Sequence, residues 1–450
     1  MIREEAQVWR AGSVAGNAGE LARAGELLPR VLSRWEVLAL AVNGVVGSGV
    51  YLLPAAAAAH LGSASVGAVP LAGFTVALVQ LCFVEAGSRF DQPGAAYVYT
   101  RAAFGEATGF AVGWMSFLGR VTAVATLSAG FAQALGYLVP AARDGPVRAL
   151  CVALPLVALV AINVRGVKLG AGTVAVLLAA KLIPLGVVIA VGLLALEPAR
   201  FHGMLALPVA GLAKAGLLLL FAYGGFENTA APAGEYRDAR RDVPFALLFQ
   251  ILAVTILYAA VQIVAVGTLP DLAASKTPLA DAAGRLVGPR GGALLTVGAA
   301  LSIVGTIASS ILAGPRYLYA ISAGGALPPV LARLHPRWRT PWVGIALLGA
   351  LALPLALSGT FVQLAALSAG TRLITYLGTA AAVPFLRRLV PAGGKVVVLP
   401  GGPAIPIAAV AVCLLLLSGI SRRDLAAIAG ALAAGLLAHG LWRFRRARVC

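Results

Sequence analysis

The chain has 450 residues, of which 60% are hydrophobic and only 12% charged, and its formal net charge is +18. Soluble domains carry about twice that charged fraction, so the composition excludes a soluble globular enzyme and indicates an all-α protein that crosses a membrane many times. The positive charge does not indicate a nucleic-acid partner, because Lys and Arg occur in short clusters between apolar runs. The cysteines form no CxxC pair, so we expect no disulfide framework and no metal site.

Residues 1–34 are polar and contain no apolar leader segment, which predicts a cytoplasmic tail. Twelve apolar runs long enough to span a bilayer follow, near 37–60, 65–87, 107–138, 147–163, 169–196, 212–233, 243–268, 291–321, 341–358, 360–386, 403–420 and 423–442. With both termini cytoplasmic, about 23 basic residues fall on the inner side and about 9 on the outer side. The basic cluster that follows the last run is expected to contact anionic lipid.

Two of these runs contain closely spaced glycines, at residues 43–50 (NGVVGSGV) and 221–228 (FAYGGFEN). Such glycines weaken a helix, and an unwound backbone is tolerated within a bilayer only where protein buries it or a cavity lies beside it. Two interrupted helices in corresponding halves of a chain are a sequence indicator of a transporter's substrate site. The alternative is that these glycines only allow helices to pack closely.

Six motifs in order resemble those of the amino acid–polyamine–organocation (APC) transporters. They are residues 46–54 (VGSGVYLLP), 89–99 (RFDQPGAAYVY), 104–114 (FGEATGFAVGW), 221–227 (FAYGGFE), 233–244 (AGEYRDARRDVP) and 313–328 (AGPRYLYAISAGGALP). Ala239 stands where the family usually has proline. The last two apolar runs resemble the family only in composition.

The resemblance implies a LeuT-type fold of twelve transmembrane helices. Its transport core, at 35–390, would hold two inverted five-helix repeats in which the interrupted first and sixth helices correspond. Residues 391–442 would form two peripheral helices, and 443–450 a cytoplasmic tail.

The two broken helices would bind the α-carboxylate and the α-ammonium, the two groups that every amino acid shares. Free N–H groups at a half-helix N-terminus suit a carboxylate, and free carbonyls suit an ammonium. Following the family pattern, we assign the carboxylate to the first break, with Ser48 Oγ as a further donor, and the ammonium to carbonyls of the second. The expected substrate-binding residues are Val46, Gly47, Ser48, Gly49, Phe221, Ala222, Tyr223 and Gly224. For Tyr223, packing against the run 291–321 is an equal alternative.

Lys181 lies near the middle of the run 169–196, where a charge is costly and by default functional. Sodium-coupled members of the resembled fold bind Na⁺ between their first, fifth and eighth helices, and some other members have a lysine there. Lys181 resembles that lysine, so we expect its ammonium to contact carbonyls near Gly44 and Val45 and a serine such as Ser309 or Ser310. Transport would then be sodium-independent, with proton coupling, exchange and facilitated diffusion all open.

Arg120 and Arg372 also fall within predicted spans, and an arginine in a membrane needs a partner. The acids available within spans are Glu227 and Glu85. We favour a structural or gating pair of either arginine with Glu227. The alternative is that one arginine binds the side-chain carboxylate of an acidic substrate.

The sequence therefore predicts an amino acid permease of the cytoplasmic membrane that works by alternating access, with amino acids, protons and lipid as its partners. We expect no cofactor, no nucleic acid and no obligatory protein partner. The chain has no Walker A, HExxH or nucleophile-elbow motif, so an enzyme is not expected. The alternatives are an amine or polyamine carrier, which would need acids in its pocket, and a non-transporting nutrient sensor.

Overall fold

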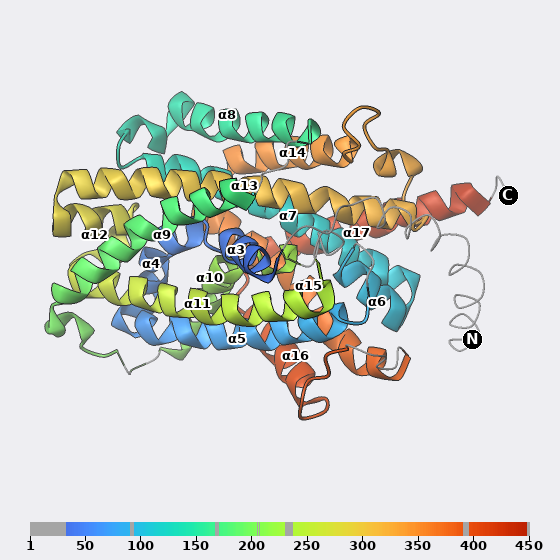
Figure 1. Ribbon diagram of the computed structural model, residues 1–450, viewed down its shortest axis with the longest axis horizontal. Coiled ribbons are helices and arrows are strands. Elements are labelled where there is room, and N and C mark those ends of the chain that lie inside the picture. The colour runs from blue at the N-terminus through green and yellow to red at the C-terminus, as the bar shows by residue number, and fades with distance from the viewer. Residues whose placement is uncertain are drawn as a thin grey trace.

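The computed structural model describes residues 33–90, 94–166, 171–204, 206, 208–229, 237–389 and 396–447. All regular elements within these residues are helices, and most of the longer ones run lengthwise through the molecule (Figure 1). Helices satisfy their backbone hydrogen bonds internally, which is what an apolar surrounding requires of a chain that crosses it.

The helices follow the apolar runs closely, with α5, for example, matching the predicted 65–87. The first half of the chain holds α3 (Arg34–Val45), α4 (Ser48–Leu61), α5 (Ser65–Gly87), α6 (Ala96–Phe104), α7 (Glu106–Leu135), α8 (Gly145–Val164) and α9 (Ala171–Leu194). The second half holds α10 (Val209–Tyr223), α11 (Ala239–Thr268), α12 (Pro278–Val287), α13 (Pro289–Ala323), α14 (Trp342–Ser358), α15 (Phe361–Leu389), α16 (Ala404–Leu417) and α17 (Arg422–Ala447). The short helices α6 and α12 were not predicted.

Six helical stretches in the described part of the chain are long and apolar enough to cross a bilayer. They are Ser48–Gly87, Glu106–Leu135, Gly145–Val164, Arg241–Thr268, Pro289–Ala323 and Arg422–Arg446. Three shorter apolar helices accompany them, at Leu178–Leu194, Trp342–Ser358 and Ala404–Leu417. Interrupted helices fall short of a full span by length alone, which is one reason why this set is smaller than the predicted twelve.

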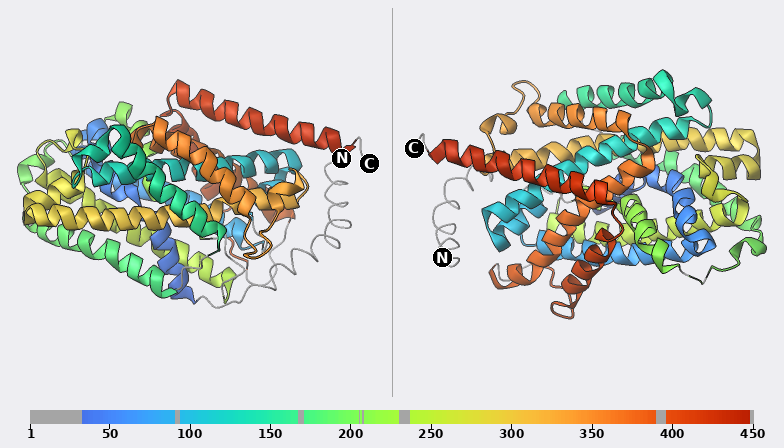
Figure 2. Two further views of the ribbon diagram at one scale, coloured as in Figure 1. Left: turned by 90° about the horizontal axis from the view of Figure 1, so that it is seen from above. Right: turned by 180° about the vertical axis from the view of Figure 1, so that it is seen from behind.

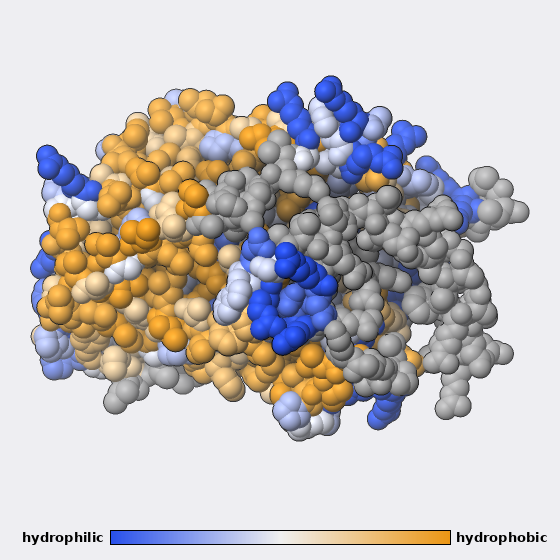
Figure 3. All heavy atoms as spheres, in the orientation of Figure 1, coloured by the Kyte–Doolittle hydropathy of each residue, from blue (hydrophilic) through white to orange (hydrophobic). Residues whose placement is uncertain are grey.

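The outer surface is apolar over most of its length. Figure 3 shows hydrophobic residues covering most of the left part of one face, with hydrophilic ones at its left edge, at the upper right, at the bottom and in one patch near the centre. Large apolar side chains point outward from α8, α9 and α11, and Leu154, Leu194 and Ile256 are 65%, 90% and 62% exposed. An apolar surface of this extent would drive a soluble protein to aggregate, but in a bilayer it faces lipid.

Helix α7 lies at the centre of the bundle and packs against α13, α15 and α14. Helix α17 lies along the outside, as the views of Figure 2 show. It is attached by hydrogen bonds from Trp114 Nε1 to the Ala431 carbonyl, 2.9 Å, and between His439 Nδ1 and the Ala326 carbonyl, 2.8 Å. The core around α7 therefore positions the site, while α17 covers one side.

Helix α3 runs across the direction of the bundle. It points toward the viewer in Figure 1, where α5, α11 and α13 lie in the plane of the picture, and the left view of Figure 2 agrees. Its contacts are with α11, α9 and α13. The ring of Trp35 packs edge to face against that of Phe245 on α11, with the ring centroids 5.4 Å apart. The change of direction takes place between α3 and α4, within the first glycine-rich stretch.

Candidate functional site

The first interruption consists of Val46 and Gly47, which separate α3 from α4. Helix α4 begins at Ser48, so the amides of its first turn have no partner within the helix. The Ser48 hydroxyl is buried and has no hydrogen-bond partner among the described residues. This helix start therefore presents unsatisfied donors of the kind that bind an anion.

The second interruption follows α10, where the chain leaves the helix at Gly224 and Gly225 before a short 3₁₀ turn, η5 (Phe226–Asn228). Gly225 has φ of +123°, and a Cβ there would lie 2.3 Å from the Gly44 carbonyl oxygen. Only glycine fits this conformation and this contact, so the second interruption lies directly against the last turn of α3. The predicted span 212–233 ends at residues that lie outside the described ones.

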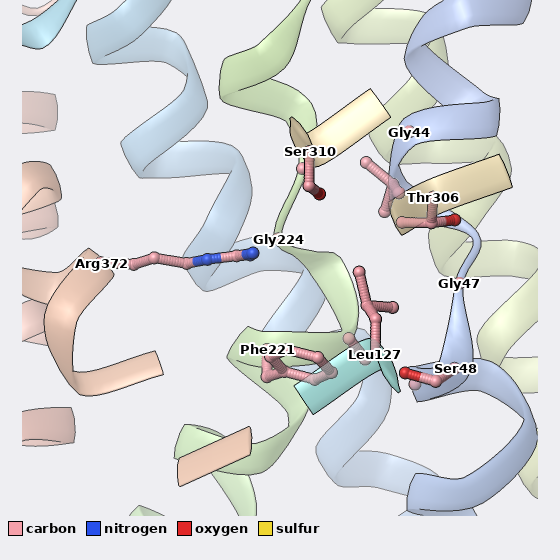
Figure 4. Close-up of a pocket in the computed structure, with 13 residues that line it drawn as sticks. Gly44, Gly47, Ser48, Leu127, Phe221, Gly224, Thr306, Ser310 and Arg372 are labelled. Carbon is pink, nitrogen blue, oxygen red and sulfur yellow. The ribbon is translucent and has the colours of Figure 1, made fainter. Parts of the chain in front are cut away.

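A small cavity lies between the two interruptions, with room for about one water molecule. Its walls come from both interruptions and from α7, α13 and α15 (Figure 4). The residues that line it are Gly44, Val45, Gly47, Ser48, Gly49, Leu127, Phe221, Ala222, Gly224, Gly225, Thr306, Ser310 and Arg372. Six of the eight predicted substrate-binding residues are among them, and the cavity must widen to admit anything larger than water.

Val46 and Tyr223 are the two predicted residues that do not line the cavity. The Tyr223 hydroxyl donates to the Val69 carbonyl of α5 at 3.1 Å, and its ring packs against that of Tyr258 on α11, with centroids 5.1 Å apart. Tyr223 was expected either to line the substrate pocket or to pack against the run 291–321. The contacts observed for it match neither expectation. The side chain of Tyr223, the last residue of α10, instead points into the interface with α5 and α11.

Tyr258 was missed by the sequence analysis, yet it connects both interruptions. Its buried hydroxyl lies 3.2 Å from the Val45 carbonyl oxygen and 3.0 Å from that of Ala222. A hydroxyl has one hydrogen to donate, so the two carbonyls share it. A lone tyrosine in an apolar run offers no sequence signal that would separate this role from ordinary packing.

The Lys181 side chain is fully buried and ends at the first interruption. Its ammonium donates to the carbonyls of Asn43, at 3.1 Å, and Val46, at 2.8 Å. These two carbonyls flank Gly44 and Val45, near which the partners were expected, while the Val45 carbonyl itself accepts from Tyr258. The last carbonyls of a helix have no partners within it, and the end of α3 supplies them to this ammonium.

The Val46 carbonyl also accepts hydrogen bonds from α13, from Ser302 Oγ at 2.9 Å and from Thr306 Oγ1 at 3.4 Å. The hydroxyls that share this acceptor with Lys181 thus belong to Ser302 and Thr306, and not to Ser309 or Ser310. Ser309 donates to the Gly305 carbonyl of its own helix at 3.1 Å, and Ser310 lines the cavity. Residues 302, 306 and 310 recur every four positions, so they share the helix face that meets the interruption.

A cluster of buried charges adjoins the second interruption. Arg120 on α7 pairs with Glu227 and donates to Asn228 Oδ1 at 2.8 Å. The other carboxylate oxygen of Glu227 accepts from the Gly225 amide at 2.9 Å. Arg372 on α15 lies farther away, with 3.7 Å between its Nε and Glu227 Oε1. Each carboxylate oxygen of Glu227 therefore already accepts one hydrogen bond, from Arg120 or from the Gly225 amide, without a contribution from Arg372.

Arg372 differs from Arg120 in lining the cavity. Its guanidinium lies directly against Gly224, which leaves no space for a side chain at that position, and 5.6 Å from the centroid of the Phe221 ring. Arg372 is only 4% exposed, and its Nε and Nη1 have no hydrogen-bond partner among the described residues. It is the charged member of the cavity wall.

Glu85, the other acid predicted within a span, lies away from the cavity. It binds Arg387 through two hydrogen bonds of 2.6 and 2.7 Å, Arg89 at 3.2 Å, and the Leu399 amide at 3.0 Å. These contacts join the end of α5 to α15 and to the segment before α16.

Apolar helices around a buried polar cavity, with two interrupted helices meeting at it, define a membrane transport protein. Residues 32–421 match the family model described as amino acid permease. The chain therefore belongs to that family, within the APC superfamily, and it is a multi-pass membrane protein as the composition predicts.

Three curated relatives from Bacillus subtilis (strain 168) cover most of the chain. The chain is 26% identical to a methylthioribose transporter, over 86% of its own length and 87% of the relative's. It is also 26% identical to the branched-chain amino acid permease BcaP, over 90% of each. It is 29% identical to the serine/threonine exchanger SteT, over 83% of the chain and 87% of the exchanger.

Proposed function

We propose that the protein moves amino acids across the cytoplasmic membrane by alternating access, without sodium. The observation that carries this proposal is the cavity, where the start of α4 and the end of α10 meet. It is lined by unsatisfied donors from one interruption and by backbone acceptors from the other. An α-amino acid carries a carboxylate and an ammonium one carbon apart, so it matches both.

In this proposal the α-carboxylate binds the first amides of α4 and Ser48 Oγ. The ammonium binds carbonyls at the end of α10. The Phe221 carbonyl accepts from the Gly224 amide at 3.0 Å, and the Ala222 carbonyl from Tyr258. Each carbonyl oxygen keeps a second lone pair for a substrate.

Sodium independence is proposed because the Lys181 ammonium already bonds to the carbonyls at the end of α3. The positive charge of this side chain would take the place of a bound sodium ion at these carbonyls. Proton symport and substrate exchange are both compatible with this lysine, and one relative is named as an exchanger.

We further propose twelve spans with both termini in the cytoplasm. The helices from α3 to α9 and from α10 to α15 would form the two inverted repeats of a core at 35–390, and α16 and α17 would be peripheral. This arrangement is supported by the equivalent interruptions that follow α3 and α10. The polar tails would be residues 1–34 and 443–450.

An amine or polyamine carrier is the second candidate, and the cavity argues against it. The charged residue in the cavity wall is Arg372, which would repel a cation. A sensor that binds amino acids without moving them would share the same cavity, so only a transport assay separates the two.

The test is uptake by the purified protein in liposomes. Labelled neutral, acidic and cationic amino acids, a polyamine and methylthioribose would be supplied in sodium-free buffer, with and without an inward proton gradient. Saturable amino acid uptake that sodium does not increase is expected. Binding without uptake would favour the sensor, and uptake of the polyamine or methylthioribose alone would overturn the amino acid proposal.

A further inference from the structure

We propose that the substrate carries a second carboxylate in its side chain, and that Arg372 binds it. This inference rests on the proposed function, because it assigns a substrate class to the same cavity. The transported amino acids would thus be acidic, and Arg372 would be the residue that determines this specificity.

The first argument is the balance of charge. Arg120, Arg372 and Glu227 form one buried cluster, in which two guanidinium groups face a single carboxylate. One positive charge is therefore uncompensated in the part of this cluster that the structure describes. A buried charge without a partner is costly, and an acidic amino acid, with its net charge of −1, would neutralise it.

The second argument is the direction of the unsatisfied donors. Arg120 uses both terminal nitrogens on Glu227 and Asn228, and it does not line the cavity. Arg372 lines the cavity, and its Nε and Nη1 have no hydrogen-bond partner among the described residues. Holding Glu227 does not require Arg372, because Arg120 and the Gly225 amide already engage that carboxylate.

The third argument is that the cavity has two anion-binding ends. Figure 4 shows Arg372 and Ser48 reaching it from opposite sides, with Leu127 between them. The Ser48 hydroxyl is fully buried, and like the Nε and Nη1 of Arg372 across from it, it has no hydrogen-bond partner within the described part of the chain. A monocarboxylic substrate can place a carboxylate at one end only, whereas an amino acid with a side-chain carboxylate can place one at each end once the cavity has widened.

Competition for uptake by the unmodified protein is the first test. Glutamate and aspartate are compared with glutamine and asparagine, which match them in shape but lack the second charge. We expect the acids to compete at least ~10-fold better, as the loss of a charged hydrogen bond predicts. Preferential uptake of the amides or of aliphatic amino acids would overturn the inference while the proposed function stood. No uptake of any amino acid would count against the proposed function itself.

The variants Arg372→Gln and Arg372→Lys test the residue. The glutamate-to-glutamine uptake ratio should fall at least ~10-fold in Arg372→Gln and be partly retained in Arg372→Lys, which keeps the charge but loses the bidentate geometry. An unchanged ratio in Arg372→Gln would overturn the inference. Arg120→Gln is the matched control, because it removes a guanidinium of the same cluster that lies outside the cavity wall. It should lower uptake of acids and amides alike.

A measurement on the unmodified protein keeps the inference testable if Arg372→Gln does not fold. Glutamate and glutamine are each added to the detergent-solubilised protein, and its thermal unfolding is followed. Preferential binding to the folded state raises the unfolding temperature, so glutamate should stabilise the protein more than glutamine at equal concentration. Equal or weaker stabilisation by glutamate would overturn the inference.

Discussion

Lys181 and Val46 are joined by a hydrogen bond of 2.8 Å between the side-chain ammonium of one and the carbonyl of the other. Val46 directly follows α3, so this bond holds the backbone where it turns from one half-helix into the next. Because α13 donates to the same carbonyl through Ser302, three segments far apart in the sequence meet at one oxygen atom.

Replacing Lys181 by alanine should reduce transport at least ~10-fold, because hydrogen bonds to charged groups are worth about 1.5–3 kcal/mol each and two are lost. Uptake into liposomes between pH 5 and pH 9 measures the effect. Lys181→Arg keeps the charge and serves as the control, although its larger head should restore activity only in part. Full activity of Lys181→Ala with the pH profile of the parent protein would contradict a coupling role.

Gly225→Ala should abolish transport and lower the unfolding temperature. The residue has φ of +123°, and the new Cβ would lie 2.3 Å from the Gly44 carbonyl oxygen. Gly186 on α9 provides a matched control, because a Cβ there meets nothing within 4 Å. Gly186→Ala should keep activity and add up to ~1 kcal/mol through helix propensity. Equal behaviour of the two variants would show that the second interruption does not depend on its glycine.

Glu227→Gln should be among the most damaging single changes in the molecule. It leaves two buried arginines without their anion, and breaking a buried pair typically costs about 3–5 kcal/mol. Thermal unfolding in detergent measures the loss. The double variant Arg120→Gln with Glu227→Gln removes one positive and one negative charge, so the pair is again neutral, and it should recover part of this stability. No recovery would mean that Asn228 and the Gly225 amide contribute more than the pairing.

Tyr258→Phe should leave the fold intact but lower stability by about 1–2 kcal/mol, because the carbonyls of Val45 and Ala222 lose their shared donor. It should also change the Michaelis constant for uptake, since the Ala222 carbonyl lies in the cavity wall. Tyr51→Phe is the comparison, because the Tyr51 hydroxyl reaches the Lys181 carbonyl only at 3.5 Å and should matter less. Identical effects of both changes would argue against a special role for Tyr258.

The helices and their interruptions were predictable because the signals are local. Apolar run lengths located α5 and α8, and glycine spacing located the ends of α3 and α10. A single lysine in the middle of an apolar run, such as Lys181, is also a local signal that predicts a functional residue. Family membership, predicted from six motifs, is confirmed by the match over residues 32–421.

The partners of these residues were not predictable in the same way. Tyr258 and Val45 are separated by 213 positions, and Ser302 and Val46 by 256, so no local pattern connects them. The two arginines are alike in sequence as single charges in apolar spans. Only the packing of α7 and α15 determines that Arg120 is enclosed by its partners while Arg372 faces the cavity.

The contact of the Lys181 ammonium with the end of α3 has a consequence for the salt concentrations at which the protein can work. A dissolved ion occupies its site according to its concentration outside the protein, whereas the Lys181 side chain is covalently attached and remains beside these carbonyls at any salt concentration. We therefore expect the turn at Val46 to hold its shape equally well in fresh water and in brine.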